Sequence, residues 1–439
     1  MGTNRKINIF WFRRDLRLDD NHALYRALNS GYKVVFLFIF DTNITRTLPA
    51  DDHRLSFIYN QLRELHHKLK KDGGCMLIRQ GVPLDVFSKL SREYEINAVY
   101  CNTDHEQYGI DRDKGIASFM AENGVGFHSY SDHLIMKRDE VLKDDKTPYV
   151  VFTPFSKRWK SLFQSRHIKP WPSGKFITNC HTGKCTGFPS LEELGLEPSS
   201  ISAPPVRIEG SVIENYDKSR DIPSADATTR LGLHLRFGTI SIRKLVEKAV
   251  RLNEVFLNEL IWREFYAIIM WHYPYVAQRS FKPEYDRINW VNDEGHFRRW
   301  CEGRTGYPMV DAGMRQLNET GYMHNRLRMI TASFLTKHLL TDWRWGEAYF
   351  AGKLFDYELS SNNGGWQWSA GSGCDAAPYF RIFNPLTQQK KFDPQEKYIR
   401  KWIKEYGTSG YPEPVVIHRE ARERCLGAYK TALRGYSNE

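Results

Sequence analysis

The first 130 residues alternate short, almost continuously apolar runs with longer segments of helical spacing. The apolar runs are Lys6 to Phe12, Lys33 to Phe40, Met76 to Arg79, Ala98 to Cys101 and Gly126 to Tyr130. Strands that are apolar on both faces and alternate with helices are typical of a parallel sheet covered on both sides. We therefore predict an α/β domain with a Rossmann-like parallel sheet over residues 1–130. Its first strand is not followed by GxGxxG, so ordinary dinucleotide binding is not indicated.

The pattern changes after this domain. From Lys169 to Pro205, Pro, Gly and Ser accumulate and the hydrophobic periodicity fades, which indicates a connector on the surface. We assign residues 131–210 to an interdomain connector. Beyond Ser211 the apolar spacing is helical, in long segments around 240–272, 308–319, 322–340 and 342–358. Residues 211–439 are therefore predicted to form an all-α domain.

The helical segment from Glu254 to His272 has two distinct faces. One stripe contains Glu259, Trp262, Arg263 and Tyr266, and the other contains Leu257, Ile261, Phe265 and Ile268. An exposed i,i+4 pair of Glu259 and Arg263, worth about 0.3–0.5 kcal/mol, is one interpretation, but it does not explain Trp262. Alternatively, a carboxylate beside an indole at a cavity wall could bind the edge of a base while the ring packs on its face.

A second two-faced segment follows Tyr322. Its core stripe is predicted to contain Met323, Leu327, Ile330 and Phe334. Asn325 and Met329 share the opposite face, which either is solvated or faces a ligand.

The segment Asn362-Asn-Gly-Gly-Trp366-Gln-Trp368 combines turn-forming residues with two indoles. Asn and Gly favour a turn and let another group approach the backbone, and the indoles supply flat faces. A tight turn beside ordinary core Trp residues is one interpretation, and a surface for a planar ligand is the other.

The excess of basic residues favours a polyanionic partner. There are 63 Lys and Arg against 52 Asp and Glu, a formal charge of +11, and 12 Trp. Solubility alone is the other interpretation of this charge. No apolar run reaches the roughly 18 residues of a membrane span, and the start lacks a signal peptide's apolar core, so we expect a cytoplasmic protein without membrane contact.

The seven scattered Cys suit reduced thiols. Cys180, His181 and Cys185 lack a second ligand pair, so no metal site is expected.

From Asn362 through residues 371–385, the sequence Gly-Ser-Gly-Cys-Asp-Ala-Ala-Pro-Tyr-Phe-Arg-Ile-Phe-Asn-Pro closely resembles the flavin domain of the photolyase and cryptochrome family. The resemblance extends from Phe10 to about Lys404 and is strongest to class I cyclobutane pyrimidine dimer photolyases. It implies a helical domain with non-covalent FAD and a light-driven carbon-carbon lyase that splits dimers in UV-damaged DNA, as a monomer. A cryptochrome-like blue-light photoreceptor is the alternative.

The resemblance also assigns residues to the flavin. It implies contacts from Tyr216, Thr228, Thr229, Arg230, Leu231, Gly232, Arg263, Arg328, Asp356, Glu358 and Asn362. Arg328 and Asp356 match an ion pair near the flavin ring, and Asn362 matches the amide that faces ring atom N5. Gly232 replaces a common Ser of the phosphate loop, and Asp356-Tyr-Glu358 replaces the frequent Asp-Gly-Asp.

Further assignments concern the lesion and electron transfer. The residues implied at the DNA or the dimer are Arg220, Glu259, Trp262, Asn325, Arg326, Met329, Trp368 and Gln388. Glu259 is expected to stabilise the reacting dimer, with Asn325 helping to hold flavin and lesion in register. Trp366, Trp343 and Trp290 match the family's electron-transfer chain.

Two comparisons within the family refine this hypothesis. Photolyases for (6-4) photoproducts carry His at the positions of Asn325 and Met329, so the neutral side chains here favour cyclobutane splitting. Around His105-Glu-Gln-Tyr-Gly109 the Asn-Glu pair that holds a folate antenna in some members is missing, so a second chromophore is left unidentified.

Overall fold

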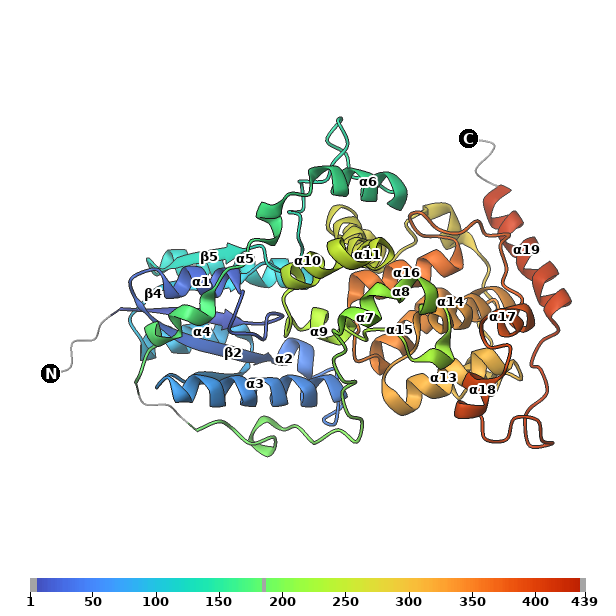
Figure 1. Ribbon diagram of the computed structural model, residues 1–439, viewed down its shortest axis with the longest axis horizontal. Coiled ribbons are helices and arrows are strands. Elements are labelled where there is room, and N and C mark those ends of the chain that lie inside the picture. Colours follow the sequence, from blue (N-terminus) through green and yellow to red (C-terminus); the bar gives the residue numbers. More distant parts are fainter. Residues whose placement is uncertain (1–5, 184–186, 435–439) are drawn as a thin grey trace. The chain divides into compact units, whose positions relative to one another are not determined.

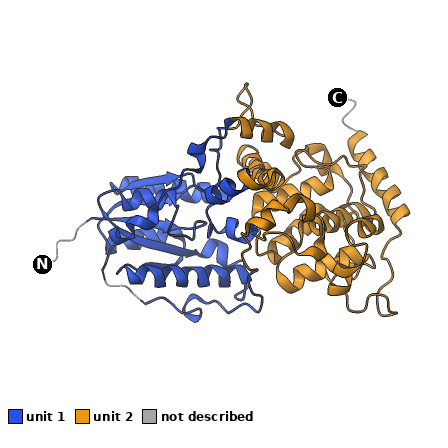
Figure 2. Cartoon of the chain, in the orientation of Figure 1, with its two compact units in different colours: residues 1–140, 162–203, 231–250 blue, residues 141–161, 204–230, 251–439 orange. Residues whose placement is uncertain are grey.

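A computed structural model describes residues 6–183 and 187–434 (Figure 1). The described residues fall into two compact units that are discontinuous in sequence (Figure 2). Unit 1 comprises residues 1–140, 162–203 and 231–250, and unit 2 comprises residues 141–161, 204–230 and 251–439. Residues 231–250, which follow the predicted connector, thus cluster with the α/β unit.

Unit 1 contains the predicted parallel sheet. Its five strands lie in the order β3-β2-β1-β4-β5, and every neighbouring pair is parallel. They are β1 (Ile7–Phe12), β2 (Lys33–Asp41), β3 (Met76–Gly81), β4 (Ile96–Asn102) and β5 (Gly126–Tyr130). β1 pairs with β2 from Ile7 opposite Lys33, without a shift in register. The α/β prediction is confirmed.

The sheet of unit 1 is buried on both faces. Ile9 and Trp11 lie in one core cluster with Phe87 and Met120, whereas Phe10 points to the opposite face and is also fully buried. Because side chains on both faces of the sheet are buried, the strands appear in the sequence as continuous apolar runs. The helices are α1 (His22–Leu28), α2 (Thr42–Thr45), α3 (His53–Lys71), α4 (Pro83–Glu93), α5 (Gln107–Glu122) and α9 (Gly232–Arg236), with most of α10 (Ile242–Leu252).

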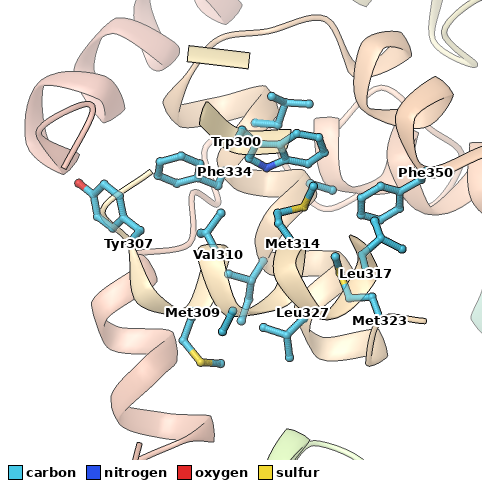
Figure 3. Close-up of a cluster of buried hydrophobic side chains, with 14 of the residues drawn as sticks. Trp300, Tyr307, Met309, Val310, Met314, Leu317, Met323, Leu327, Phe334 and Phe350 are labelled. Carbon is cyan, nitrogen blue, oxygen red and sulfur yellow. The ribbon is translucent and has the colours of Figure 1, made fainter. Parts of the chain in front are cut away.

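Unit 2 is helical, as predicted. Its helices are α6 (Phe152–Leu162), α7 (Gly210–Glu214), α8 (Tyr216–Ser219), α11 (Glu254–His272), α12 (Glu294–Cys301), α13 (Pro308–Thr320), α14 (Asn325–Ser333), α15 (Trp343–Lys353), α16 (Leu359–Ala370), α17 (Pro385–Phe392), α18 (Lys397–Trp402) and α19 (His418–Arg434). Figure 3 shows the core beside α13 and α14, where Trp300, Met314 and Leu327 are fully buried. A π-helical turn, Phe334–His338, continues α14.

Of the two interpretations of Asn362–Trp368, the tight turn is wrong, because these residues lie within α16. Two glycines of this segment have different surroundings: Gly364 packs against a ring, and Gly365 borders open space. A Cβ on Gly364 would lie 2.2 Å from the ring of Tyr266, whereas a Cβ on Gly365 would meet nothing within 4 Å. Local turn preference is therefore overridden by tertiary contacts that a single sequence does not reveal.

Three further observations concern expectations from the sequence. Cys101, Cys180, Cys301, Cys374 and Cys425 are free, but Cys75 is disulfide-bonded, so the expectation of reduced thiols is wrong for Cys75. Across residues 6–183 and 187–434, no three His, Cys, Asp or Glu side chains are arranged to hold a metal, and Cys185 lies outside these residues. Within the same residues, no helix has the length and apolarity needed to cross a membrane.

Candidate functional site

A cavity of about 370 Å³ opens in unit 2 between α11, α14 and α16. Its size lies within the usual range of ligand pockets. Twelve residues with a predicted role line it, namely Arg220, Glu259, Trp262, Arg263, Asn325, Arg328, Met329, Asp356, Glu358, Asn362, Trp366 and Trp368. Segments as distant in the sequence as Arg220 and Trp368 thus converge on a single site.

Helix α11 supplies one wall of the pocket. Asn253 caps it, because its side chain accepts a hydrogen bond from the Phe256 amide at 3.0 Å. The stripe that starts at Glu259 lines the pocket, and the stripe that starts at Leu257 is buried, as predicted. The indole of Trp262 stacks on the ring of Phe152, with centroids 3.8 Å apart.

The i,i+4 interpretation of Glu259 and Arg263 is wrong, because each binds elsewhere. Glu259 Oε1 accepts from Arg220 Nη1 at 2.5 Å, and Arg263 Nε donates to Glu358 Oε2 at 3.0 Å. Burial raises the pKa of Glu259, and the Arg220 guanidinium opposes that rise. Glu259 is therefore a carboxyl group held at a pocket wall with an increased tendency to carry a proton.

Helix α14 supplies a second wall. Its predicted core stripe is buried, and Asn325 and Met329 face the pocket, as predicted. Arg328 Nη2 donates to both oxygens of Asp356, at 3.0 and 2.9 Å. Arg326 does not line the cavity, since its guanidinium binds Asp221 Oδ1 at 2.6 Å.

Helix α16 places Asn362 in the pocket in a fixed orientation. Asn362 Nδ2 donates to the backbone oxygen of Glu347 at 3.1 Å and to Glu347 Oε1 at 2.8 Å. An amide nitrogen has two N–H groups, so both are used here. The carbonyl oxygen of Asn362 remains as an acceptor for a ligand. Sequence reasoning missed Glu347, because nothing in its local pattern distinguishes it from an exposed helical Glu.

The space beside Gly365 fits a flat ligand. Gly365 lines the cavity and has no heavy atom within 4 Å of its Cβ position, so a ring can approach the backbone there. Asn362 supplies an acceptor at the same helix, and the Arg328–Asp356 ion pair supplies charge and donors. These residues fit an aromatic heterocycle with polar edges. Gly365 was not singled out among the predicted site residues.

The predicted flavin contacts from Thr228 to Gly232 are not among the residues that line the cavity. Thr228 Oγ1 is 3.1 Å from the Tyr322 hydroxyl oxygen, and Thr229 is buried. Arg230 lies over the ring of Tyr322, 4.8 Å from its centroid. Leu231 and Gly232 begin the stretch 231–250 that belongs to unit 1.

Two more predicted residues, Tyr216 and Gln388, are not among those that line the cavity. Tyr216 packs its ring edge against Phe256 and lies 5.2 Å beneath the Arg220 guanidinium. Gln388 is half-buried on α17.

The three predicted electron-transfer residues belong to one core cluster. Trp366 and Trp343 are buried in it, and Trp290 packs against it. Trp366 lines the pocket, so it is the member nearest a ligand there. Its ring also meets Trp300 edge-on, with centroids 6.0 Å apart, a contact that spacing alone does not reveal.

Comparison with known proteins gives consistent matches to both units. A family model described as the FAD binding domain of DNA photolyase matches residues 256–409, and one described as DNA photolyase matches residues 8–175. A deoxyribodipyrimidine photo-lyase of Vibrio cholerae is 35% identical over 470 residues, which cover 97% of this chain and 100% of the relative. The deoxyribodipyrimidine photo-lyase of Escherichia coli is 36% identical over 98% of this chain and 99% of the relative.

Solved structures agree with this result. A class III photolyase from Agrobacterium tumefaciens superposes with a TM-score of 0.87 at 31% identity, over 99% of each chain. An archaeal photolyase from Sulfolobus tokodaii, described as holding two FAD molecules, has a TM-score of 0.82 at 34% identity, over 97% of this chain and 99% of that one. A Synechocystis cryptochrome, at 24% identity and a TM-score of 0.83, shares the fold over 98% and 100% of the chains.

Proposed function

This chain belongs to the DNA photolyase family, and from that membership we propose that it is a light-driven DNA repair lyase that splits cyclobutane pyrimidine dimers. The observation that carries the proposal is the cavity of about 370 Å³ in unit 2. It brings Glu259 and Trp262 of α11 together with Asn362 and Trp366 of α16. A wall of aromatic and amide groups suits planar ligands with polar edges, such as a flavin and a pyrimidine dimer turned out of the duplex.

Unit 2 contains the residues that would hold non-covalent FAD, and reduced FAD would supply the light-driven electron that opens the cyclobutane ring. Arg328, held by Asp356, and Arg263, held by Glu358, present fixed donors to it. The carbonyl oxygen of Asn362 would accept a hydrogen bond from the flavin ring. Tyr216 and the segment from Thr228 to Gly232 are proposed for the remainder of the cofactor.

The lesion occupies the same pocket. Photolyases are known to turn their target bases out of the duplex, and we extend that step to this chain. Trp262 and Trp368 enclose the dimer between flat faces, and Glu259 binds its edge. Glu259 is proposed to stabilise the negative charge that develops on a dimer carbonyl by hydrogen bonding or proton sharing, and burial, which raises its pKa, favours proton sharing.

Arg220, Arg326, Asn325 and Gln388 are proposed to contact DNA. Their phosphate contacts make the affinity salt-dependent. A DNA substrate favours a cytoplasmic location, and we propose that the chain acts on it as a monomer.

The pocket favours cyclobutane dimers over (6-4) photoproducts. Asn325 and Met329 carry no titratable group, and no histidine is among the described residues that line the cavity. The described lining therefore provides no imidazole for acid-base chemistry.

Trp366, Trp343 and Trp290 are proposed to return bound flavin to its reduced form by passing electrons to it from the surface.

The test uses two oligonucleotides, one with a single thymine cyclobutane dimer and one with a single (6-4) photoproduct. Each is mixed with chemically reduced protein, and half of each sample is kept dark. We expect reversal of the cyclobutane dimer alone, and only under blue light. No reversal of either lesion by a flavin-loaded protein would contradict the proposal and favour a photoreceptor.

A further inference from the structure

Four charged side chains form a row of alternating sign that starts in the pocket and leaves it. Glu259 Oε1 is 2.5 Å from Arg220 Nη1, and Arg220 Nε is 4.0 Å from Asp221 Oδ1. The same Asp221 oxygen is 2.6 Å from Arg326 Nη2. Arg220 and Glu259 line the cavity, whereas Asp221 and Arg326 do not. The row therefore links the pocket wall to the first turn of α14.

Asp221 Oδ1 lies between two guanidinium groups, where a phosphate oxygen of DNA could also lie. A carboxylate oxygen placed between two guanidinium groups makes the contacts that a phosphate oxygen would make with the same pair. The Asp221 side chain is 45% exposed, so an incoming phosphate can reach this position. DNA must therefore displace Asp221 before it can bind both arginines.

The two arginines do not depend on Asp221 alone for their placement. Arg220 lies over the ring of Tyr216 at 5.2 Å, and Arg326 lies over the ring of Phe392 at 4.3 Å. Aromatic faces hold guanidinium groups by cation–π attraction and by covering their flat surfaces. Asp221 thus neutralises a phosphate site that its neighbours already shape.

The charge balance of the row changes when a dimer enters. In the free protein the two guanidinium groups lie beside the carboxyl groups of Glu259 and Asp221, which reduce the positive charge that a phosphate meets. A dimer that binds Glu259 removes the 2.5 Å partner of Arg220. Two arginines then share one carboxylate, and a phosphate is attracted to the excess positive charge. Backbone binding becomes stronger when the lesion is in place.

We propose that Asp221 is a specificity-determining residue, which lowers the affinity for undamaged DNA by competing with its phosphates for Arg220 and Arg326. The inference rests on the proposed function, because it requires a dimer to take Glu259 away from Arg220. It adds to that function a repulsive element against the wrong ligand. Specificity is a difference between two affinities, and such an element increases it without strengthening the correct complex.

The test is Asp221→Asn, with dissociation constants measured for the same duplex with and without one thymine dimer, at several salt concentrations. We expect the variant to bind undamaged DNA about five- to tenfold more tightly, with a salt slope steeper by about one, since one more phosphate contact forms. The affinity for the duplex with the dimer should increase by less. The ratio of the affinity for dimer DNA to the affinity for undamaged DNA should therefore fall. Asp221→Glu keeps the charge and should keep the ratio near that of the wild type.

Asp217→Asn is the matched control. It removes one negative charge four residues earlier, from a carboxylate that accepts from the Asn253 amide at 2.8 Å. We expect little change in the ratio for this variant. An unchanged ratio in Asp221→Asn, or weaker binding of undamaged DNA with an unchanged melting temperature, would overturn the inference. A wild-type protein with no preference for dimer DNA would instead contradict the proposed function.

Discussion

Replacing Glu347 by leucine removes the group that orients Asn362 in the pocket. Glu347 Oε1 accepts from Asn362 Nδ2 at 2.8 Å, and the backbone oxygen of Glu347 accepts from the same nitrogen at 3.1 Å. With leucine, the side-chain bond is lost and the amide can turn its nitrogen towards the ligand. The carbonyl oxygen would then no longer be reserved for the flavin N5–H group.

The size of the effect follows from the bond that is removed. A hydrogen bond to a charged group contributes about 1.5–3 kcal/mol. About 1.4 kcal/mol corresponds to a tenfold change in an equilibrium, or 59 mV for one electron, so the full effect is roughly 60–130 mV. Part of it is recovered by water and by the remaining backbone bond. We expect Glu347→Leu to lower the reduction potential of bound FAD by roughly 30–130 mV.

The assay is a spectroelectrochemical titration of the flavin in the purified protein. Glu347→Gln is the matched control, because its amide oxygen can still accept from Asn362, and it should shift the potential far less than Glu347→Leu. Flavin content and melting temperature show whether the pocket is intact. A potential within about 10 mV of the wild type, in a fully loaded Glu347→Leu protein, would refute the reasoning.

Three further predictions concern electron transfer, packing and acid stability. Trp366→Phe should abolish photoreduction of oxidised flavin but leave repair by chemically reduced protein nearly unchanged, as followed by flavin absorbance and by dimer reversal; equal photoreduction would remove Trp366 from the electron-transfer chain. Gly364→Ala should lower the free energy of unfolding by about 1–3 kcal/mol, because its Cβ would lie 2.2 Å from the Tyr266 ring, whereas Gly365→Ala should keep the melting temperature and lose flavin. Asp132 is buried, and although burial raises its pKa, two arginines hold that pKa well below its usual value. Asp132→Asn should therefore cost about 3–5 kcal/mol at pH 7 in a denaturant titration, and the difference from wild type should shrink as the pH falls below about 4; a constant difference down to acid pH would contradict this pairing.

The parts of the fold that the sequence predicts are those set by periodicity. Buried strands such as β2 are apolar on both faces, and the two stripes of α11 follow from the helical repeat. These repeats separate the face of α11 that carries Glu259 and Trp262 from its buried face, whereas the choice between solvent and a cavity wall came from the family resemblance. The same reasoning placed Asn325 and Met329 on the face of α14 that lines the pocket.

Features set by contacts between distant segments could not be predicted in this way. The Asn362–Trp368 segment has turn composition but is helical, because Gly364 accommodates the ring of Tyr266 across the helix pair. Glu259 pairs with Arg220 rather than with its own helix neighbour, and a pattern within one helix cannot reveal such a partner. Likewise, the grouping of residues 231–250 with unit 1 depends on the folded path of the chain.

The central claim is that bound, reduced flavin in this pocket splits a cyclobutane dimer when it absorbs light. We would mix reduced protein with an oligonucleotide that carries one thymine dimer, in the dark, and record thymine absorbance before and after a single pulse of blue light. Our account predicts that thymine absorbance returns after the pulse and not in the dark, in the wild type and in Trp366→Phe alike. A flavin-loaded, dimer-bound protein that restores no thymine absorbance would contradict it.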